Sequence, residues 1–434
     1  MRILIANWSR RMVGGVETHL NSIIPEIAQL GHETAFVSEV SLPAGRELIA
    51  LPLGVPAWCV EESGEDEVLA AVTAWRPDLI YVHKLERPEF EARLLGVAPA
   101  VFFAHDYYGT CISGLKTFKT PVTTPCDRRF GWQCLAHYYP HRCGGLNPVT
   151  MLKLYRLQSR RLRLLRRYRA ILTHSEHLKA EYIKHGIEPA RVFNLSYYAR
   201  KSRPAPRTDA ESLHGTPSEG AEAGASAPRD GDGRPFRLLF LGRMDRLKGG
   251  QILLDALPRA RALLGRPVRL VFAGDGPARG AWEQSALALS RWHEGIEVEF
   301  AGWVQGAALD SLLASSDLLV VPSQWPEPFG LVGVEAGLRG VPAAAFAVGG
   351  IPTWLSDGVN GHLAPGDPPT AEGLAEAVAK CLRDPQAHAR LRRGAVEKAR
   401  HFNLESHLRA LKEVFEHVLS EENGSGVGRE RRGG

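Results

Sequence analysis

A strand-like segment followed at once by a loop and a helix start constrains the fold of this chain more than any other feature. Residues 317–321 form an apolar run, and residues 327–335 then place Glu327 and Glu335 around a turn of proline, phenylalanine and glycine. In parallel α/β sheets, such a unit binds ligands where the strand ends and the helix begins. Carboxylates bind pairs of hydroxyls and helix amides bind phosphate, so the segment favours a sugar nucleotide. The alternative is that the two glutamates only stabilise the helix dipole.

A second loop of the same kind lies earlier in the same half of the chain. Residues 242–250 follow a strand-like run at 236–241 and precede a helix-like run at 252–257. Arg243 and Lys248 in this loop can converge on one anion. The planar guanidinium of an arginine and the flexible ammonium of a lysine together suit a diphosphate. A solvated basic loop would explain the charges, but not their position between a strand end and a helix start.

The two loops carry the spacing Gly-Arg-x4-Lys-Gly followed by Glu-x7-Glu, which resembles the family 4 retaining glycosyltransferases. The resemblance covers most of residues 234–365. It implies the GT-B architecture, an α/β fold with two Rossmann-like βαβ domains that face each other across a cleft. Further segments match the family in the expected order at residues 273–277, 300–304, 347–352 and 357–361.

This resemblance implies a role for each residue of the two loops. Arg243 and Lys248 would neutralise the donor diphosphate, while Glu327 would hold hydroxyls of the transferred sugar and orient it. Glu335 would bind the ribose hydroxyls. Backbone groups of the remaining residues would contact the sugar, the distal phosphate or the base: Phe329, Gly330, Leu331, Trp303 and Val304. Many relatives carry a glutamate after the Gly-Gly-x-Pro segment, whereas Thr353 and Trp354 stand here, so no contact is carried over at that position.

The N-terminal half begins with a buried-strand pattern at residues 2–7 and an amphipathic run at 16–30 that ends at Gly31. Gly14 and Gly15 lie between them and permit close approach of a ligand to the backbone. The third glycine and the downstream acid of a dinucleotide fingerprint are missing. In the family that the chain resembles, this diglycine loop faces the donor phosphates from the domain opposite the donor-binding one.

Further strand-like runs at residues 78–83, 100–104, 169–174 and 192–195 predict one βα domain with a mostly parallel sheet, and Ser175 is expected to cap a helix. His105 follows the second of these runs and so lies on the same edge of the sheet as the diglycine loop. The resemblance favours its contact with the donor sugar or acceptor, through a neutral imidazole or as a proton relay. For an arbitrary histidine, burial with backbone partners would be the simpler explanation.

Length and composition predict two to three domains, since 434 residues with 44% hydrophobic content can fill ordinary cores. We expect an acceptor-side domain at 1–200 and a nucleotide-sugar domain at 234–400. Residues 201–233 are poor in large apolar groups and are predicted to form a disordered linker. The helix expected at 401–420 crosses back to the first domain in this family, and a disordered tail is predicted at 421–434.

A cysteine-rich insertion is expected at about residues 107–150. Its separations are long and lack a close Cys-x2-Cys pair, so free thiols or ordinary packing are the first interpretation and a structural metal the second. No other metal and no cofactor besides the donor is expected. The insertion directly follows His105, which suggests that it shapes the acceptor pocket. The cysteines concerned are Cys111, Cys126, Cys134 and Cys143.

Two features bear on the location of the protein. No apolar stretch reaches the roughly 20 residues of a transmembrane helix, and we expect a cytoplasmic chain. Residues 151–169 carry arginines without an acid, with apolar residues at helical spacing. They predict either a helix on an anionic membrane surface, near a lipid-linked acceptor, or a solvated basic face of the domain. Nucleic acid is disfavoured, since the modest net charge of +5 comes without a recognised module.

These observations predict a glycosyltransferase that uses a nucleoside-diphosphate sugar, in polysaccharide or glycolipid synthesis, and the resemblance alone implies that it retains the anomeric configuration. Arg243, Lys248 and helix amides would replace a divalent ion at the leaving group, with Glu327 and His105 completing the catalytic set. Two other classes compete with this prediction: a sugar-nucleotide epimerase of similar two-domain shape, and a non-catalytic protein that binds sugar nucleotides.

Overall fold

The computed structural model describes residues 1–12, 14–41, 47–195, 197–199 and 234–426, and the contacts divide the chain into two compact units. The linker predicted at 201–233 lies outside the described residues. Within the cysteine-rich insertion, ten residues group with the second unit rather than the first. The first unit comprises Met1–Lys116, Asp127–Ser196 and Glu405–Gly434, and the second comprises Thr117–Cys126 and Tyr197–Leu404.

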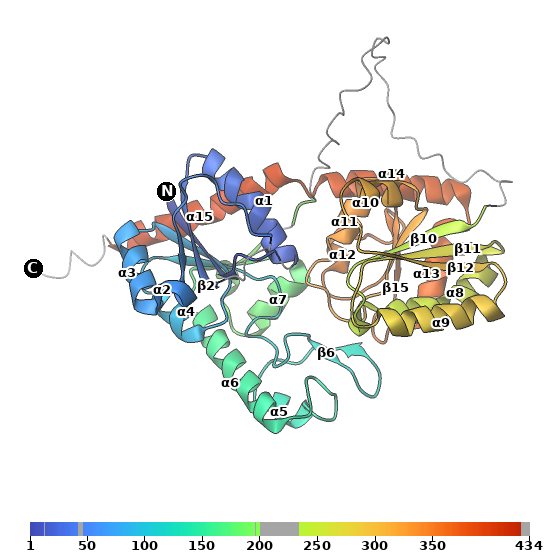
Figure 1. The fold of residues 1–434 in the computed structure, drawn as a ribbon, viewed down its shortest axis with the longest axis horizontal. Helices are drawn as coiled ribbons and strands as arrows, with labels where there is room; N and C mark the ends of the chain where they lie inside the picture. Colours follow the sequence, from blue (N-terminus) through green and yellow to red (C-terminus); the bar gives the residue numbers. More distant parts are fainter. Residues whose placement is uncertain (13, 42–46, 196, 200–233, 427–434) are drawn as a thin grey trace, which may run out of the picture. The chain divides into compact units, whose positions relative to one another are not determined.

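The first unit is built on a sheet of seven described strands in which all neighbours are parallel (Figure 1). Five of them were predicted from the sequence, and β2 and β3 complete the sheet. In sheet order the strands are β3 (Ala57–Cys59), β2 (Glu33–Val40), β1 (Arg2–Ser9), β4 (Leu79–Lys84), β5 (Ala100–Phe103), β8 (Ala170–Thr173) and β9 (Val192–Asn194).

Helices cover both faces of this sheet, which explains why its central strands are apolar on both sides. Ile3 and Ile5 of β1 are as deeply buried as Leu4 and Ala6 between them. Ser175 caps α7 as predicted: its hydroxyl accepts a hydrogen bond from the Leu178 amide at 3.3 Å. The helices of this unit are α1 (Gly15–Gln29), α2 (Val60–Ser63), α3 (Glu65–Trp75), α4 (Pro88–Leu94), α5 (Gln133–His137), α6 (Pro148–Leu165), α7 (Glu176–Lys184) and α15 (Leu404–Gly426), with a 3-10 turn at Pro189–Arg191.

The C-terminal helix α15 groups with the first unit from Glu405 onward. Its His407 ring meets the His19 ring of α1 edge-on, with centroids 5.2 Å apart. The helix continues to Gly426, whereas the sequence predicted a disordered tail from residue 421. Residues 427–434 of that tail lie outside the described residues.

The second unit is built on a sheet of six described strands, again with parallel neighbours only. In sheet order they are β12 (Ile296–Gly302), β11 (Val268–Ala273), β10 (Phe236–Leu241), β13 (Leu318–Val321), β14 (Ala343–Phe346) and β15 (Gly361–Ala364). Its helices are α8 (Gly250–Leu264), α9 (Arg279–Trp292), α10 (Ala307–Ala314), α11 (Val332–Gly337), α12 (Ile351–Trp354), α13 (Ala371–Leu382) and α14 (Pro385–Arg400), with a 3-10 turn at Arg246–Lys248 and the small hairpin of β6 (Thr117–Phe118) and β7 (Thr124–Pro125).

Each sheet has one point where the strand order reverses. In the first unit β2 and β3 lie on one side of β1 while β4 and its successors lie on the other, and in the second unit β10 and β13 flank the same kind of reversal. The loops leaving two such strands diverge to opposite faces, which opens a crevice at their carboxyl ends. The loops after β1, β4, β10 and β13 are therefore the natural ligand positions in this chain.

Candidate active site

In the second unit, the loops after β10 and β13 are joined by a direct ion pair. Lys248 Nζ lies 2.6 Å from Glu327 Oε1, and the Ser323 hydroxyl donates to the same oxygen. Glu327 is nearly buried, while about a third of the Lys248 side chain is exposed. Oε2 of Glu327 makes no hydrogen bond to a described residue, so one carboxylate oxygen is fixed and the other can accept from a ligand.

Two glycines allow the backbone segments of this site to approach closely. Gly249 has φ +77°, and a Cβ there would lie 1.8 Å from the Pro322 carbonyl oxygen. Gly349, at φ +57°, packs against the backbone of Glu327, whose carbonyl accepts the Gly350 amide at 2.6 Å. Both positions require glycine. A side chain at Gly249 would push the Lys248 loop away from the loop after β13, and one at Gly349 would push the loop after β14 away from Glu327.

Thr353 and Trp354 stand in the segment where many relatives carry a glutamate, and Trp354 packs against the Glu327–Glu335 loop. Its side chain is buried, and its indole N–H donates to the Phe329 carbonyl at 2.7 Å. A Cβ on Gly333 would lie 2.1 Å from the ring, so Gly333 provides the space that the indole occupies. The departure from the family pattern is thus a packing residue in this chain.

The other predicted donor residues lie on the same edge of the sheet. Arg243 is exposed in the loop after β10, and the exposed Trp303 and half-buried Val304 follow β12. The Gly274 amide donates to the Gly302 carbonyl at 2.7 Å, which ties together the loops after β11 and β12. The remaining predicted residues cluster at the start of α11: Phe329 is buried, while Gly330, Leu331 and Glu335 are half-buried.

In the first unit, the loops after β1, β4 and β5 surround a hollow of about 330 Å³. Gly14, Gly15 and His105, all predicted from the sequence, line it. The other lining residues were not predicted from the sequence, although Lys84 directly follows a predicted strand and could have been found by that position. These are Trp8, Val16, Glu17, Lys84, Glu86 and Asp106.

The Glu17 side chain folds back onto the diglycine loop and bonds to its backbone. Its carboxylate accepts the Gly14 amide at 3.0 Å and the Trp8 indole N–H at 3.2 Å, and the side chain is buried. The family resemblance predicted that Gly14 and Gly15 face the donor phosphates. In this structure the Gly14 amide is already bonded within α1, in a capping box that Glu17 completes. Gly15, the first residue of α1, is exposed to the hollow.

His105 is paired with a second histidine that the sequence analysis did not consider. His83 Nδ1 lies 2.8 Å from His105 Nε2, and the two rings stack with centroids 5.1 Å apart. Burial and, to a smaller extent, the positive charge of Lys84 together lower the pKa of His105 to about 3. His105 is therefore neutral at physiological pH.

The two rings belong to a larger group of histidines around Phe103. Burial lowers the pKa of His19, His83 and His174 as well, so these residues form a neutral aromatic layer beside the hollow. Among the described residues, no group of three or more His, Cys, Asp or Glu side chains is arranged to hold a metal ion.

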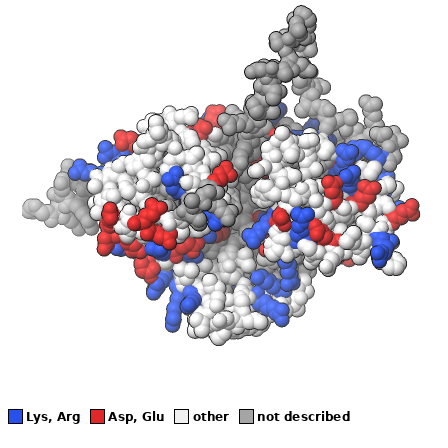
Figure 2. All heavy atoms as spheres, viewed as in Figure 1, with Lys and Arg blue, Asp and Glu red and all other residues white. Residues whose placement is uncertain are grey.

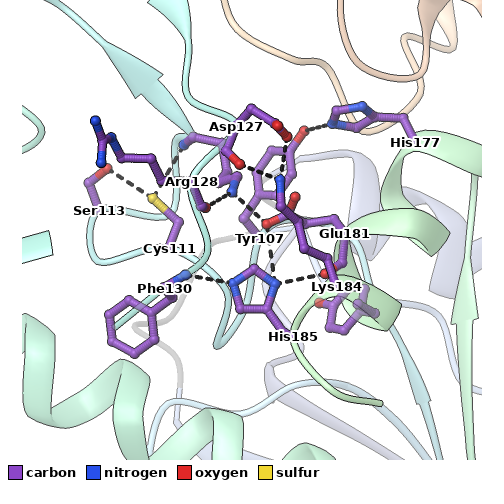
Figure 3. Close-up of polar contacts among 12 residues, drawn as sticks. Tyr107, Cys111, Ser113, Asp127, Arg128, Phe130, His177, Glu181, Lys184 and His185 are labelled. Atoms are coloured by element: carbon purple, nitrogen blue, oxygen red, sulfur yellow. Dashed lines mark hydrogen bonds and ion pairs between the residues drawn. The ribbon is translucent and has the colours of Figure 1, made fainter. Parts of the chain in front are cut away.

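Buried polar contacts to α7 and to the residue that follows it hold the cysteine-rich insertion in place (Figure 3). Lys116 Nζ lies 2.5 Å from Glu181 Oε1 and donates to the Arg128 carbonyl, and both side chains are nearly inaccessible. His185 accepts the Phe130 amide at 2.7 Å. None of the four cysteines of the insertion forms a disulfide with a described residue. The second interpretation, a structural metal on Cys111, Cys126, Cys134 and Cys143, finds no support in this geometry.

Helix α6 carries the predicted basic segment, but its apolar stripe faces the domain. Leu165 and Tyr168 are fully buried, and Arg161 is buried with its guanidinium over the Tyr108 ring. This agrees with the domain-face alternative for the stripe. Figure 2 shows cationic side chains over the outer side of α6. The exposed residues of the helix include Val149, Leu152, Lys153, Arg156, Arg160 and Arg163. No described helix combines the length and apolar character needed to cross a membrane.

Comparison with solved structures defines the fold class first. The chain is similar to HepE of Anabaena, solved with UDP and glucose, at a TM-score of 0.60 and 18% identity, covering 96% of this chain and 100% of the other. It is equally similar to sucrose-phosphate synthase of Thermosynechococcus elongatus, at 0.61 and 18%, covering 97% and 99%. The two parallel-sheet units thus have the fold of GT-B glycosyltransferases.

Sequence comparison then gives the family. Residues 13–193 match Glycosyltransferase Family 4, and residues 227–400 match Glycosyl transferases group 1. The chain belongs to the family 4 glycosyltransferases. It is 36% identical to a D-inositol 3-phosphate glycosyltransferase of Frankia alni over half of its own length and 53% of the relative's. It is 24% identical to the glycogen synthase of Mycobacterium tuberculosis over 92% of its length and 90% of that protein. The chain thus spans about half the length of the curated relatives that it matches at higher identity.

Proposed function

We propose that this protein transfers a sugar from a nucleoside-diphosphate donor to a hydroxyl of a carbohydrate or lipid-linked acceptor, with retention of anomeric configuration. The observation that carries the proposal is the contact between Lys248 and Glu327 at the strand-order reversal of the second unit. A cation for the diphosphate and a carboxylate for the sugar hydroxyls are then adjacent, which matches the adjacent diphosphate and sugar of a sugar nucleotide.

The donor diphosphate is proposed to bind between Lys248, Arg243 and the amides at the start of α11. Arg243 is exposed and makes no side-chain hydrogen bond or ion pair with a described residue, so it can turn to a phosphate without breaking a contact. Glu327 would accept hydroxyls of the sugar through Oε2, and Glu335 would accept the ribose hydroxyls. The base would lie near the backbone of Trp303 and Val304. HepE was solved with UDP, so a uridine diphosphate sugar is the first donor to test.

The chemical step is proposed as a front-face displacement. The bond between the anomeric carbon and the diphosphate oxygen breaks, and a bond to the acceptor oxygen forms on the same face of the sugar. The acceptor proton passes to the departing phosphate, whose growing negative charge Arg243 and Lys248 stabilise. Glu327 orients the sugar and forms no covalent bond to it.

The acceptor is proposed to enter by the hollow of the first unit. Trp8 offers an aromatic surface, and the lining carboxylates and the amino group of Lys84 can exchange hydrogen bonds with hydroxyls. The neutral His105 can contact the reacting sugars. We further propose peripheral membrane contact through the exposed cationic side of α6, with Val149 and Leu152 at its tip.

The proposal is tested by incubating the protein with a panel of nucleoside-diphosphate sugars, with and without acceptor extract. Product formation only with acceptor identifies a transferase, and the anomeric coupling constant of the product reports retention. Conversion of the donor without acceptor would indicate an epimerase instead. If a donor raises the thermal stability of the protein but no product forms, the protein binds sugar nucleotides without catalysing transfer. Lys248→Ala and Glu327→Ala should abolish transfer with the fold intact, and an undiminished rate in either variant overturns the residue assignment.

A further inference from the structure

The hollow of the first unit has a lining suited to a sugar ring. Among the described residues that line it, Trp8 is an aromatic side chain and Lys84 is the one cation, beside three carboxyl groups. At about 330 Å³ the hollow lies at the small end of the roughly 300–1,000 Å³ found for ligand pockets. A site of this size takes one ring of an acceptor, and its polar groups decide the chemical class of that ring.

Trp8 provides an aromatic surface that is already held in place. It is half-buried near the end of β1, between the buried Asn7 and Ser9. Its indole N–H donates to Glu17 Oε1 at 3.2 Å, while Glu17 Oε2 accepts the Gly14 amide at 3.0 Å. The polar group of the indole is thus bonded within the protein. The apolar ring remains for a ligand, and the C–H groups of a sugar can pack against it.

Lys84 and Glu86 form a pair that a hydroxyl can bridge. Lys84 Nζ lies 3.5 Å from Glu86 Oε1, which is longer than a normal hydrogen bond. Glu86 Oε2 is held by Arg161 Nη2 at 3.1 Å, so the oxygen nearer the lysine can serve a ligand. A hydroxyl both donates and accepts, so it can donate to Glu86 Oε1 and accept from Lys84. A phosphate dianion only accepts and an ammonium only donates, so neither satisfies both groups.

The balance of charge around the hollow also favours an uncharged ligand. Glu17 and Glu86 are matched by Lys84 and by Arg161, which bonds to Glu86. The third carboxyl belongs to Asp106, whose pKa is raised by burial, so it carries less charge than an exposed aspartate would. The site therefore has no surplus cation for a phosphate. An ammonium group of a ligand would lie beside Lys84 and be repelled by it.

We propose that the hollow of the first unit is the subsite for an uncharged sugar ring of the acceptor, which packs on Trp8 while one of its hydroxyls bridges Lys84 and Glu86. The inference rests on the proposed function and deepens it, because it names the acceptor as a neutral carbohydrate and not a sugar phosphate or an amino sugar. Lys84 and Glu86 then determine acceptor specificity, and Trp8 supplies the apolar contact.

Sugars with the same ring and different charge test the class of ligand on the intact protein. The probes are the methyl glycosides of glucose, galactose and mannose, with the 6-phosphate and the 2-amino form of each. Saturation-transfer NMR titrations, which need no donor and no catalysis, give the dissociation constants. We expect at least one methyl glycoside to bind, and its phosphorylated and amino counterparts to bind at least roughly 5-fold more weakly.

Two substitutions in the lining locate the binding, and each has a matched control in the same unit. Trp8→Leu removes the aromatic surface; its control is Trp58→Leu, because Trp58 is also half-buried but packs on Trp75. Lys84→Met removes the ammonium; its control is Lys179→Met, at a half-buried lysine of α7 outside the lining. The dissociation constant should rise roughly 3- to 10-fold in each lining variant. It should stay within about twofold in each control.

In the transfer assay, the two lining variants should raise the acceptor KM and leave the donor KM unchanged. The inference is overturned if no methyl glycoside binds, if a phosphorylated or amino form binds more tightly, or if either lining variant matches its control. If Trp8→Leu does not fold, Lys84→Met and the comparison of the three charges still decide. A wild type that binds a glycoside in the hollow but transfers no sugar would refute the proposed function and leave the subsite standing.

Discussion

Lys248 and Glu327 are 79 residues apart in the chain, yet Nζ of the lysine lies 2.6 Å from Oε1 of the glutamate. The two residues belong to the loops that follow the adjacent strands β10 and β13. The contact is asymmetric, because the carboxylate is nearly buried and the ammonium is partly exposed. Lys248 also lies over the Trp325 ring, 5.5 Å from its centroid. The pair thus forms a charged site in which the lysine remains accessible to an anion while the glutamate is held in place.

The pair allows structural and catalytic roles to be separated. Lys248→Met should lower the free energy of unfolding by roughly 1–3 kcal/mol, because it leaves the Glu327 carboxylate with only the Ser323 hydroxyl. Adding Glu327→Gln to that variant should recover part of the stability, since the buried charge is gone. Transfer should stay undetectable in the double variant. Urea denaturation measures the change in unfolding free energy. The transfer rate is measured with an acceptor and corrected for hydrolysis of the donor. Restored activity together with stability would show that the pair is only structural.

Trp354 should control donor affinity through the loop that it supports. Trp354→Phe keeps most of the packing but leaves the Phe329 carbonyl without its indole donor, at a cost of roughly 1 kcal/mol. We expect the donor KM to rise several-fold, with a smaller effect on kcat. Phe236→Leu is the control, because Phe236 is also buried in the same unit but lies at the start of β10, beneath the Arg266 guanidinium. Equal KM values in the two variants would contradict the loop-supporting role.

Glu91 should make the first unit less stable as the pH rises. Burial raises the pKa of Glu91 to about 7, although the Tyr108 and Tyr168 hydroxyls donate to it. The folded protein holds this proton at pH values where the unfolded chain has released it. Stability should therefore fall between about pH 4.5 and pH 7, by an amount on the order of 3 kcal/mol.

Glu91→Gln should remove that dependence, because the amide has no proton to lose. The measurement is the unfolding free energy of both proteins at pH 5 and pH 8 in the same denaturant. The difference between wild type and variant should shift in favour of the variant at the higher pH. Parallel curves for the two proteins would show that Glu91 titrates normally in the fold.

Membrane contact by α6 should depend on the sign of its exposed charges. The doubly charge-reversed variant Arg156→Glu with Arg163→Glu should partition onto anionic vesicles at least roughly 10-fold more weakly, since each surface arginine contributes about 1 kcal/mol. Reversal of Arg390 and Arg393 on α14 changes net charge equally at exposed positions of the second unit. Sedimentation with phosphatidylserine vesicles at low salt gives the comparison. Equal loss in both variants would indicate nonspecific charge attraction, and absence of wild-type binding would end the proposal.

The sequence alone determined the local units of this protein. Apolar runs bounded by glycine, proline and capping residues predicted five strands of the first sheet, the strands β10 and β13 of the second, and the helices after β1, β8, β10 and β13. These signals are local, since they depend on which side chains can be buried along a strand and which loop residues can end it. The same patterns located Arg243, Lys248, Glu327 and Glu335 beside strand ends, which is why they could be proposed as one site.

Only the tertiary structure decided which residues share a neighbourhood. Burial of a polar group depends on every element packed against it, and no local pattern records that. The sequence therefore did not reveal three hydrogen bonds: from the Gly14 amide to Glu17, between His83 and His105, and from the Trp354 indole to the Phe329 carbonyl in the donor loop. For the same reason, the apolar stripe of residues 151–169 could be counted from the sequence. Its direction towards the domain was fixed only by the side chains that it packs against.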